Sequence, residues 1–311
     1  MSRFRADLVL LLVALIWGSA FAVQRVAAQY FDVFTFNGLR FLLGGLVLVP
    51  FSRLNPLRYI KSNRIKLSNQ SANLVTPLDG KSYLFMFLGG GLLLAAAGLQ
   101  QAGLESTTAG NAGFITTLYV VFVPILLVIF WKEKIHWLAW LGAFIAIIGS
   151  LLLSTAGTMR LAKGDALVLV GSIFWALHLI LVSRAVRHMD LITFSAGQYI
   201  IAGIFNLLLN FNKQVPPLEA GSGWWTILYI GLLSTAVGYT LQGLGQKYAP
   251  PTDATILLSM EAVFAALTGA IFLGEDMQPI QLLGCALILS AVLITQMQSL
   301  RSYSPVINIK E

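Results

Sequence analysis

Residues 257–267 read "LLSMEAVFAAL", a run in which one carboxylate, Glu261, stands among uncharged and mostly apolar side chains. The composition of the whole chain indicates which solvent surrounds this run. Of the 311 residues, 57% are hydrophobic and only 11% are charged, and the mean hydropathy is +0.80. Since roughly a quarter of the residues of a soluble domain are charged, the sequence predicts an integral membrane protein.

The run belongs to one of ten apolar segments that are long enough to cross a bilayer. A membrane-spanning helix needs about 20 apolar residues. The segments are 8–27, 33–50, 82–102, 107–130, 135–155, 165–183, 191–210, 224–245, 253–273 and 279–297. Period-two alternation, the mark of a membrane barrel, is absent. We therefore expect an all-α integral membrane protein with ten transmembrane helices, the first of which is not a cleaved signal peptide.

The distribution of lysine and arginine predicts the orientation. The two terminal segments and alternate connections hold 15 of these residues, and the opposite connections hold 4. Because basic residues accumulate on the cytoplasmic side, we expect a multi-pass protein of the plasma (inner) membrane with both termini in the cytoplasm. The net charge of +7 follows from this asymmetry. It does not argue for nucleic acid, and the basic loop at 53–81 is either a solvated connector or a contact for anionic membrane lipid.

An internal repeat organises the chain. A shift of 158 residues aligns the first two helices with helices 6 and 7, and a shift of 142 aligns helices 3–5 with 8–10. The aligned pairs include Trp17 with Trp175, Gln100 with Gln242, and Tyr119 with Glu261. Five helices per copy is an odd number, so the copies have inverted topology, as in many secondary transporters. The predicted parts are 1–157 with a cytoplasmic loop at 51–81, 158–300, and a cytoplasmic tail at 301–311.

With this repeat, the sequence resembles the drug/metabolite transporter superfamily in its ten-helix EamA branch. The matching pieces are "LLLVALIWGSAFAVQRV", "TFNGLRFLLGGL", "AGNAGFITTLYVVFVPILL" and "SMEAVFAALTGAIFLGE" in helices 1, 2, 4 and 9. The resemblance implies two inverted five-helix repeats around a central cavity. Helices 1, 3, 4, 6, 8 and 9 would line this cavity, and helices 5 and 10 would brace the outside. It also implies the transport of small organic solutes.

The sequence departs from the family at two prolines. The family often has a proline where this chain has Val120 and Ala262, and the first half has Pro124 instead. A proline inside a helix removes a backbone hydrogen bond and kinks it. We therefore expect the kink of helix 4 one turn lower than in the family, and a straighter helix 9.

Glu261 is the strongest candidate for a functional residue. Nine residues at about 1.5 Å each, counted from Thr252, place it about 13–14 Å deep, near the middle of the bilayer. A carboxylate there must pair, face water or take up a proton. Two interpretations stay open: a protonated acid that holds two helices together, or a site for a solute amine or a coupling proton. In the second, Tyr119 faces Glu261 across the repeat axis.

Further cavity candidates are aromatic and amide side chains at helical spacing. Trp17, Ala20 and Gln24 share one face of helix 1, and the matching face of helix 6 carries Trp175 and His178. The remaining candidates are Gln100, Asn111, Tyr239 and Gln242. Each has an alternative as packing bulk or as an interhelical hydrogen bond. Arg40 in helix 2 is expected beside the cavity, in a structural role.

The sequence lacks the residue patterns of metal sites and enzyme active sites. No HExxH motif, cysteine pair or assembled triad is visible among three histidines and one cysteine, so we expect no cofactor, no metal and no enzyme. The predicted function is a secondary transporter that moves a small organic solute, an amino acid or related metabolite, by alternating access. The expected direction is efflux, and the expected driving ion is the proton. The alternatives are a lipid-handling or regulatory membrane protein, and a membrane-embedded enzyme.

Overall fold

The computed structural model describes residues 1–52, 78–107, 109–155, 163–210, 223–273 and 278–302. All the secondary structure within these ranges is helical. The elements are α1 (Arg3–Ala27), α2 (Val33–Leu48), η1 (Val49–Phe51), α4 (Gly80–Leu104), α5 (Ala109–Thr117), α6 (Tyr119–Trp131), α7 (Trp137–Thr155), α8 (Lys163–His188), α9 (Leu191–Leu209), α10 (Trp224–Leu228), η2 (Tyr229–Tyr239), α11 (Thr240–Gln246), α12 (Pro251–Leu258), α13 (Met260–Leu273) and α14 (Pro279–Ser302). The predicted loop at 51–81 and the tail at 301–311 lie mainly outside the described residues.

These elements form the ten predicted spans. Seven helical stretches within the described residues are long and apolar enough to cross a membrane. Shorter apolar helices at α7 and α14 supply two more, and α12 with α13 supplies the tenth. The outer surface carries large apolar side chains, with Phe4 68% and Phe144 62% exposed. Such a surface is costly in water and suits lipid.

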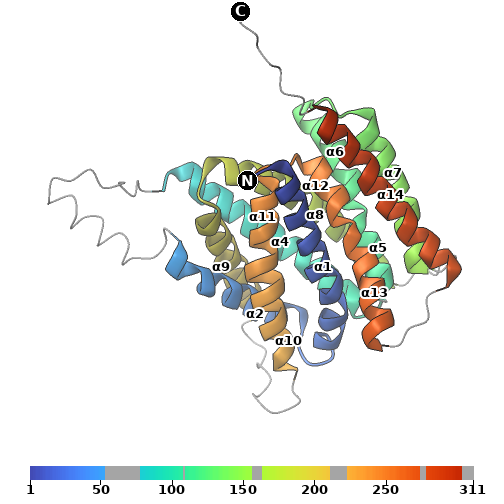
Figure 1. Cartoon of the computed structure of the whole chain (residues 1–311). Helices are drawn as coiled ribbons and strands as arrows, with labels where there is room; N and C mark the ends of the chain where they lie inside the picture. The colour runs from blue at the N-terminus through green and yellow to red at the C-terminus, as the bar shows by residue number, and fades with distance from the viewer. Residues whose placement is uncertain (53–77, 108, 156–162, 211–222, 274–277, 303–311) are drawn as a thin grey trace, which may run out of the picture.

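The helices pack as crossed pairs from the two halves (Figure 1). α4 packs against α8, α2 against α9, and α1 against α13, so each of these contacts joins one repeat to the other. α7 and α14 lie together at one side of the bundle, as the resemblance implied for helices 5 and 10. The two EamA-like halves are therefore interleaved around a common centre, as expected for inverted repeats.

Three spans are interrupted near this centre. The fourth span breaks at Leu118, between α5 and α6, and the ninth breaks at Ser259, between α12 and α13. Shifted by 142 residues, Ser259 corresponds to Thr117, so the breaks are equivalent to within one residue. In the eighth span, η2 is a π-helix, a form that often marks functional sites.

The breaks correct the expectation for the two helices. The kink predicted from Pro124 is wrong in place, since Pro124 lies inside α6 and the interruption comes earlier, at Leu118. The prediction of a straighter helix 9 is also wrong. Ser259 interrupts that helix with no proline inside α12 or α13 after Pro251, its first residue. The backbone at Ser259 stays in the right-handed helical region, and the Ala262 amide donates to the Ser259 carbonyl three residues back, so the helix tightens there without a proline.

Candidate functional site

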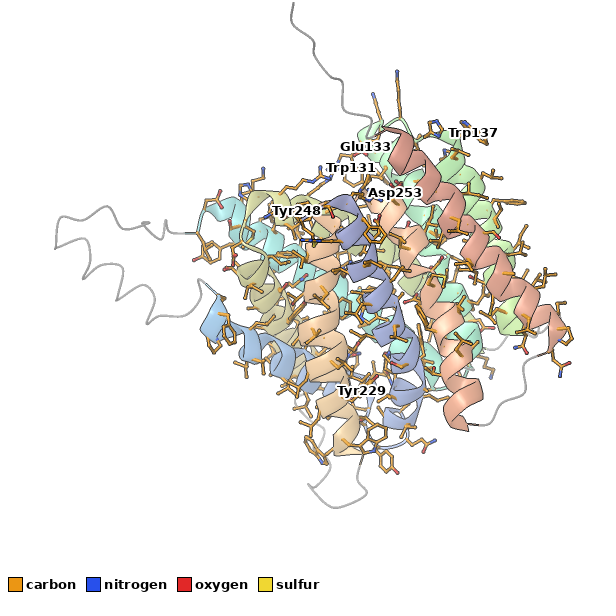
Figure 2. All side chains as sticks on the ribbon, viewed as in Figure 1. Trp131, Glu133, Trp137, Tyr229, Tyr248 and Asp253 are labelled. Carbon is orange, nitrogen blue, oxygen red and sulfur yellow. The ribbon has the colours of Figure 1, made fainter. Side chains whose placement is uncertain are left out.

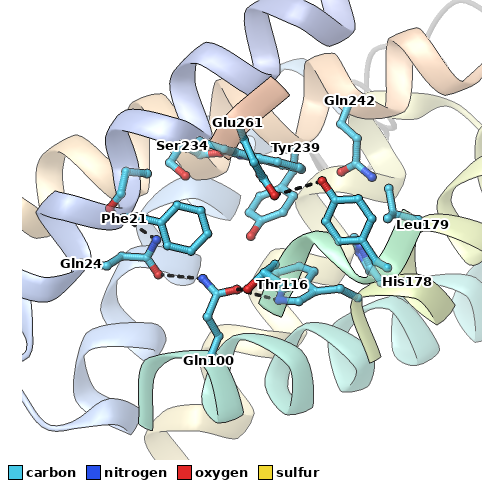
Figure 3. Close-up of a pocket in the computed structure, with 14 residues that line it drawn as sticks. Phe21, Gln24, Gln100, Thr116, His178, Leu179, Ser234, Tyr239, Gln242 and Glu261 are labelled. Carbon is cyan, nitrogen blue, oxygen red and sulfur yellow. Dashed lines mark hydrogen bonds between the residues drawn. The ribbon is translucent and has the colours of Figure 1, made fainter. Parts of the chain in front are cut away.

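A cavity lies where the helices of both halves meet (Figure 3). The space not filled by protein atoms is about 450 Å³ with its open solvent included, of which about 40 Å³ can hold the centre of a water molecule. The lining residues come from α1, α4, α5, α6, α8, η2, α11 and α13, which are the six spans that the resemblance implied. They are Trp17, Ala20, Phe21, Gln24, Gln100, Thr116, Tyr119, Trp175, His178, Leu179, Ser234, Tyr239, Gln242 and Glu261.

Glu261 and Tyr119 meet inside this cavity. The Tyr119 hydroxyl donates a hydrogen bond of 3.0 Å to Glu261 Oε1, drawn as a dashed line in Figure 3. Each residue follows the break in its span, so equivalent backbone turns deliver both side chains. Both side chains are buried, and no other hydrogen bond within the described residues involves the Glu261 carboxylate. The site therefore presents one acid with acceptor capacity to spare.

An aromatic wall stands beside the carboxylate. The rings of Trp175 and Tyr239 are stacked, with centroids 5.8 Å apart and an interplanar angle of 14°. Trp17 packs against the same tyrosine at 4.7 Å. Its indole nitrogen donates to the Ser234 carbonyl at 3.3 Å, inside the π-helix. Flat aromatic faces at this spacing suit the apolar part of a solute.

Amide side chains form a polar strip on α1 and α4. Trp175 Nε1 donates to Gln100 Oε1 at 2.8 Å, and Gln100 Nε2 donates to Gln24 Oε1 at 3.4 Å. The repeat equivalent of Gln100 is bonded differently, because Gln242 donates to Gln246 at 2.9 Å. Gln242 Oε1 has no hydrogen-bond partner among the described residues. An unsatisfied buried acceptor is costly, so this oxygen is available to a ligand or water.

His178 breaks the symmetry of the two halves. Its Nε2 lies 3.0 Å from Gln198 Oε1, and its Nδ1 has no partner within the described part of the chain. The corresponding position of the first half is Ala20. One side of the cavity is therefore lined by an apolar methyl group where the other carries an imidazole.

The predicted site residues gather here with one exception. Trp17, Gln100, Tyr119, Trp175, His178, Tyr239, Gln242 and Glu261 all line the cavity. Asn111 lies in α5, and its side chain is outside the described residues. Sequence reasoning missed Phe21, Leu179 and Ser234. The first two look like packing residues in a sequence, and Ser234 contributes through its backbone carbonyl, which no residue pattern reveals.

Thiol labelling tests whether the cavity holds water. In a Cys285→Ser background, we expect Ala20→Cys to react with a small aqueous thiol reagent, because Ala20 lines the cavity. Ala14→Cys is the matched control on the same helix: both alanines are buried, at 1% exposed for Ala20 and 0% for Ala14, but Ala14 does not line the cavity and should stay unreacted. Gly238 is unsuitable for this test, because a Cβ there would lie 2.8 Å from Trp17 Nε1. Equal protection of both cysteines would contradict an aqueous cavity.

Family comparison gives two matches along the chain. Residues 4–155 and 162–297 each match the model of the EamA-like transporter family. A solved crystal structure is similar over 97% of this chain and 100% of that one, with a TM-score of 0.73 and 17% identity. At that identity, the similarity concerns the fold alone.

Individual relatives span most of the chain. An uncharacterized transporter of Archaeoglobus fulgidus is 31% identical over 95% of this chain and 87% of its own length. The threonine/homoserine exporter RhtA of Escherichia coli is 29% identical, over 82% of this chain and 79% of its own. The uncharacterized inner membrane transporter YedA of Escherichia coli is 25% identical, over 90% and 87%.

Proposed function

The chain belongs to the EamA-like transporter family, and from this premise we propose that it is a secondary transporter of a small amine-bearing solute, such as an amino acid. The observation that supports this substrate class is Glu261, a buried carboxylate held at the meeting point of the two halves. A relative named as a threonine/homoserine exporter supports the same class and an outward direction of transport.

The chemistry of the cavity favours an amine over an anion. Among its described lining residues, Glu261 is the one carboxylate, and none is lysine or arginine. A phosphate or sulfate would meet an acid and no cationic anchor. An ammonium group would neutralise Glu261, while the stacked faces of Trp175 and Tyr239 would cover its apolar side chain. The free acceptor of Gln242 would satisfy a further donor of the solute.

Polar contacts link α1 to the second half of the chain at both of its ends. At its start, Arg3 binds Asp253 at 2.9 Å and links α1 to α12. At its end, Arg25 donates to the Thr107 carbonyl, and the Thr107 hydroxyl donates to Asp165 at the start of α8. In our proposal, one of these links opens while the other holds, so the cavity faces one side of the membrane at a time.

Proton coupling follows if a proton and the solute amine compete for Glu261. Protonated Glu261 is neutral, so the protein can change between its inward-facing and outward-facing states without an unpaired charge in the membrane. Protonation of Glu261 from one side then releases the amine to that side. Efflux driven by an inward proton gradient across the inner membrane is the resulting cycle, and it requires no bound cofactor.

Reconstituted vesicles test the proposed function. We expect labelled L-threonine or L-homoserine to accumulate in vesicles containing the protein, with a rate that changes when a pH gradient is imposed. Protein-free vesicles and vesicles with the Glu261→Gln variant are the controls. If no labelled amino acid enters in any gradient while the vesicles stay sealed, the proposal of an amino-acid substrate is wrong.

A reporter fusion tests the orientation. The N-terminus and the end of α14 lie at the same end of the bundle (Figure 1), together with Trp131, Glu133 and Asp253 (Figure 2). From the lysine and arginine distribution, we propose that this end is cytoplasmic. Of two reporters fused after Lys310, the one that functions only in the cytoplasm should be active, and the one that functions only in the periplasm should be inactive. Activity of a periplasm-dependent reporter there would reverse the orientation.

A further inference from the structure

Arg40 is a buried cation that has no role in the proposed transport cycle and is not among the cavity-lining residues. It lies in α2 and is 1% exposed. Its Nε donates to Asn37 Oδ1 at 2.8 Å, and its guanidinium packs 4.6 Å from the centre of the Phe41 ring. None of the ion pairs within the described residues includes it. An arginine held at membrane depth without a carboxylate partner is costly and points to function.

Tyr239 connects this cation to the cavity. Arg40 packs on the Phe41 ring at 4.6 Å, and that ring packs against the Tyr239 ring with centroids 6.4 Å apart, so the guanidinium lies beside Tyr239. The same tyrosine lines the cavity together with Glu261. A hydroxyl next to a cation is polarised and becomes a stronger donor. The cavity wall therefore presents a positively biased hydroxyl on the side of Arg40 and a carboxylate at Glu261.

The repeat shows that each half contributes one of these charges. The equivalent of Arg40 in the second half is the neutral Gln198, and the equivalent of Glu261 in the first half is the neutral Tyr119. Gln198 is engaged with His178. The two halves have thus diverged at two positions, one gaining a cation and the other an acid. Their sum is neutral, which matches a solute that carries one charge of each sign.

We propose that Arg40, acting through Tyr239, is the positioning residue for a carboxylate on the solute, and that the transporter selects zwitterions. This inference rests on the proposed function. The solute's ammonium group binds Glu261 and its carboxylate accepts a hydrogen bond from the Tyr239 hydroxyl. A simple amine leaves the biased hydroxyl without its acceptor, and a dicarboxylate brings one negative charge too many, so both bind less well.

A pair of competitors that differ by the carboxylate tests this. In vesicles, uptake of labelled L-threonine is measured against unlabelled L-threonine and against 1-amino-2-propanol, which is threonine without its carboxylate. For the wild type, we expect half inhibition by 1-amino-2-propanol to require a concentration at least about tenfold higher than half inhibition by L-threonine. A lost hydrogen bond to a charged group implies a difference of this size. In Arg40→Gln, which copies Gln198, and in Tyr239→Phe, this ratio should fall toward one.

The controls separate selectivity from folding. Arg184→Gln removes an exposed arginine and should keep the wild-type ratio, and Arg40→Lys keeps the charge and should give an intermediate ratio. If Arg40→Gln fails to fold, Tyr239→Phe still tests the inference, because it removes the hydroxyl and leaves the buried cation in place. A ratio near one in the wild type, or an unchanged ratio in Tyr239→Phe, would overturn the inference while leaving amino-acid transport intact. Absence of threonine uptake by the wild type is a different result and would overturn the proposed function as well.

Discussion

Glu261→Gln should abolish uptake of the amine-bearing solute, or its dependence on pH, while the protein folds and inserts normally. Glutamine has nearly the same shape and can still accept the hydrogen bond from the Tyr119 hydroxyl, which is 3.0 Å long in the native protein. It cannot neutralise an ammonium group or take up a proton at physiological pH. We expect a loss of initial rate of about a hundredfold, in line with removal of a buried ionic contact worth about 3 kcal/mol.

Two variants serve as controls for Glu261. Tyr119→Phe removes the hydrogen bond and leaves the carboxylate, so it should reduce uptake without removing the pH dependence. Glu133→Gln changes a carboxylate whose side chain is 46% exposed and which pairs with Arg184 outside the cavity, and it should transport normally. Wild-type uptake by Glu261→Gln with an unchanged pH profile would assign Glu261 a purely structural role.

Gly18→Ala should cost both stability and transport. At this point α1 touches the backbone of α13, and a Cβ on Gly18 would lie 2.6 Å from the Glu261 carbonyl oxygen and 2.8 Å from the Ala265 nitrogen. Backbone atoms cannot turn aside as a flexible side chain can. The two helices must separate, which shifts Glu261 and costs about 1–3 kcal/mol by overpacking. Thermal unfolding in detergent and uptake in vesicles measure the two effects.

The matched control is another glycine with room around it. A Cβ on Gly98 of α4 would meet nothing within 4 Å. Gly98→Ala should therefore leave stability unchanged or raise it slightly, since alanine favours the helix by about 1 kcal/mol over glycine. Equal thermal stability of Gly18→Ala and Gly98→Ala would show that the contact between α1 and α13 does not constrain the site.

Much of the site could be predicted because the repeat indicates which residues lie close together in the fold. The shift of 142 residues pairs Tyr119 with Glu261, and residues paired by an inverted repeat near its axis are brought together by the fold. The structure places them in hydrogen-bond contact. The same reasoning paired Trp17 with Trp175, and both line the cavity around Tyr239. Their role in binding is a proposal.

The local backbone could not be predicted in the same way. Pro124 predicted the wrong turn of its span, because it lies inside α6 and the helical pattern is interrupted before it, at Leu118. The π-helix at Tyr229–Tyr239 has no residue signature, yet its Ser234 carbonyl accepts from Trp17. Arg40 looked structural, since it lies behind the cavity wall, and its packing on Phe41 beside Tyr239 needs three-dimensional coordinates to be seen.

Protection of Ala20→Cys by solute tests most directly whether this cavity binds what the protein transports. Ala20 lines the cavity on α1 with Trp17 and Gln24. In the Cys285→Ser background, the rate of labelling by a small thiol reagent is measured with and without saturating transported amino acid. We predict that the amino acid slows labelling severalfold, and that it has no such effect in Glu261→Gln. An unchanged labelling rate under conditions where the amino acid is transported would contradict the assignment of this cavity as the substrate site.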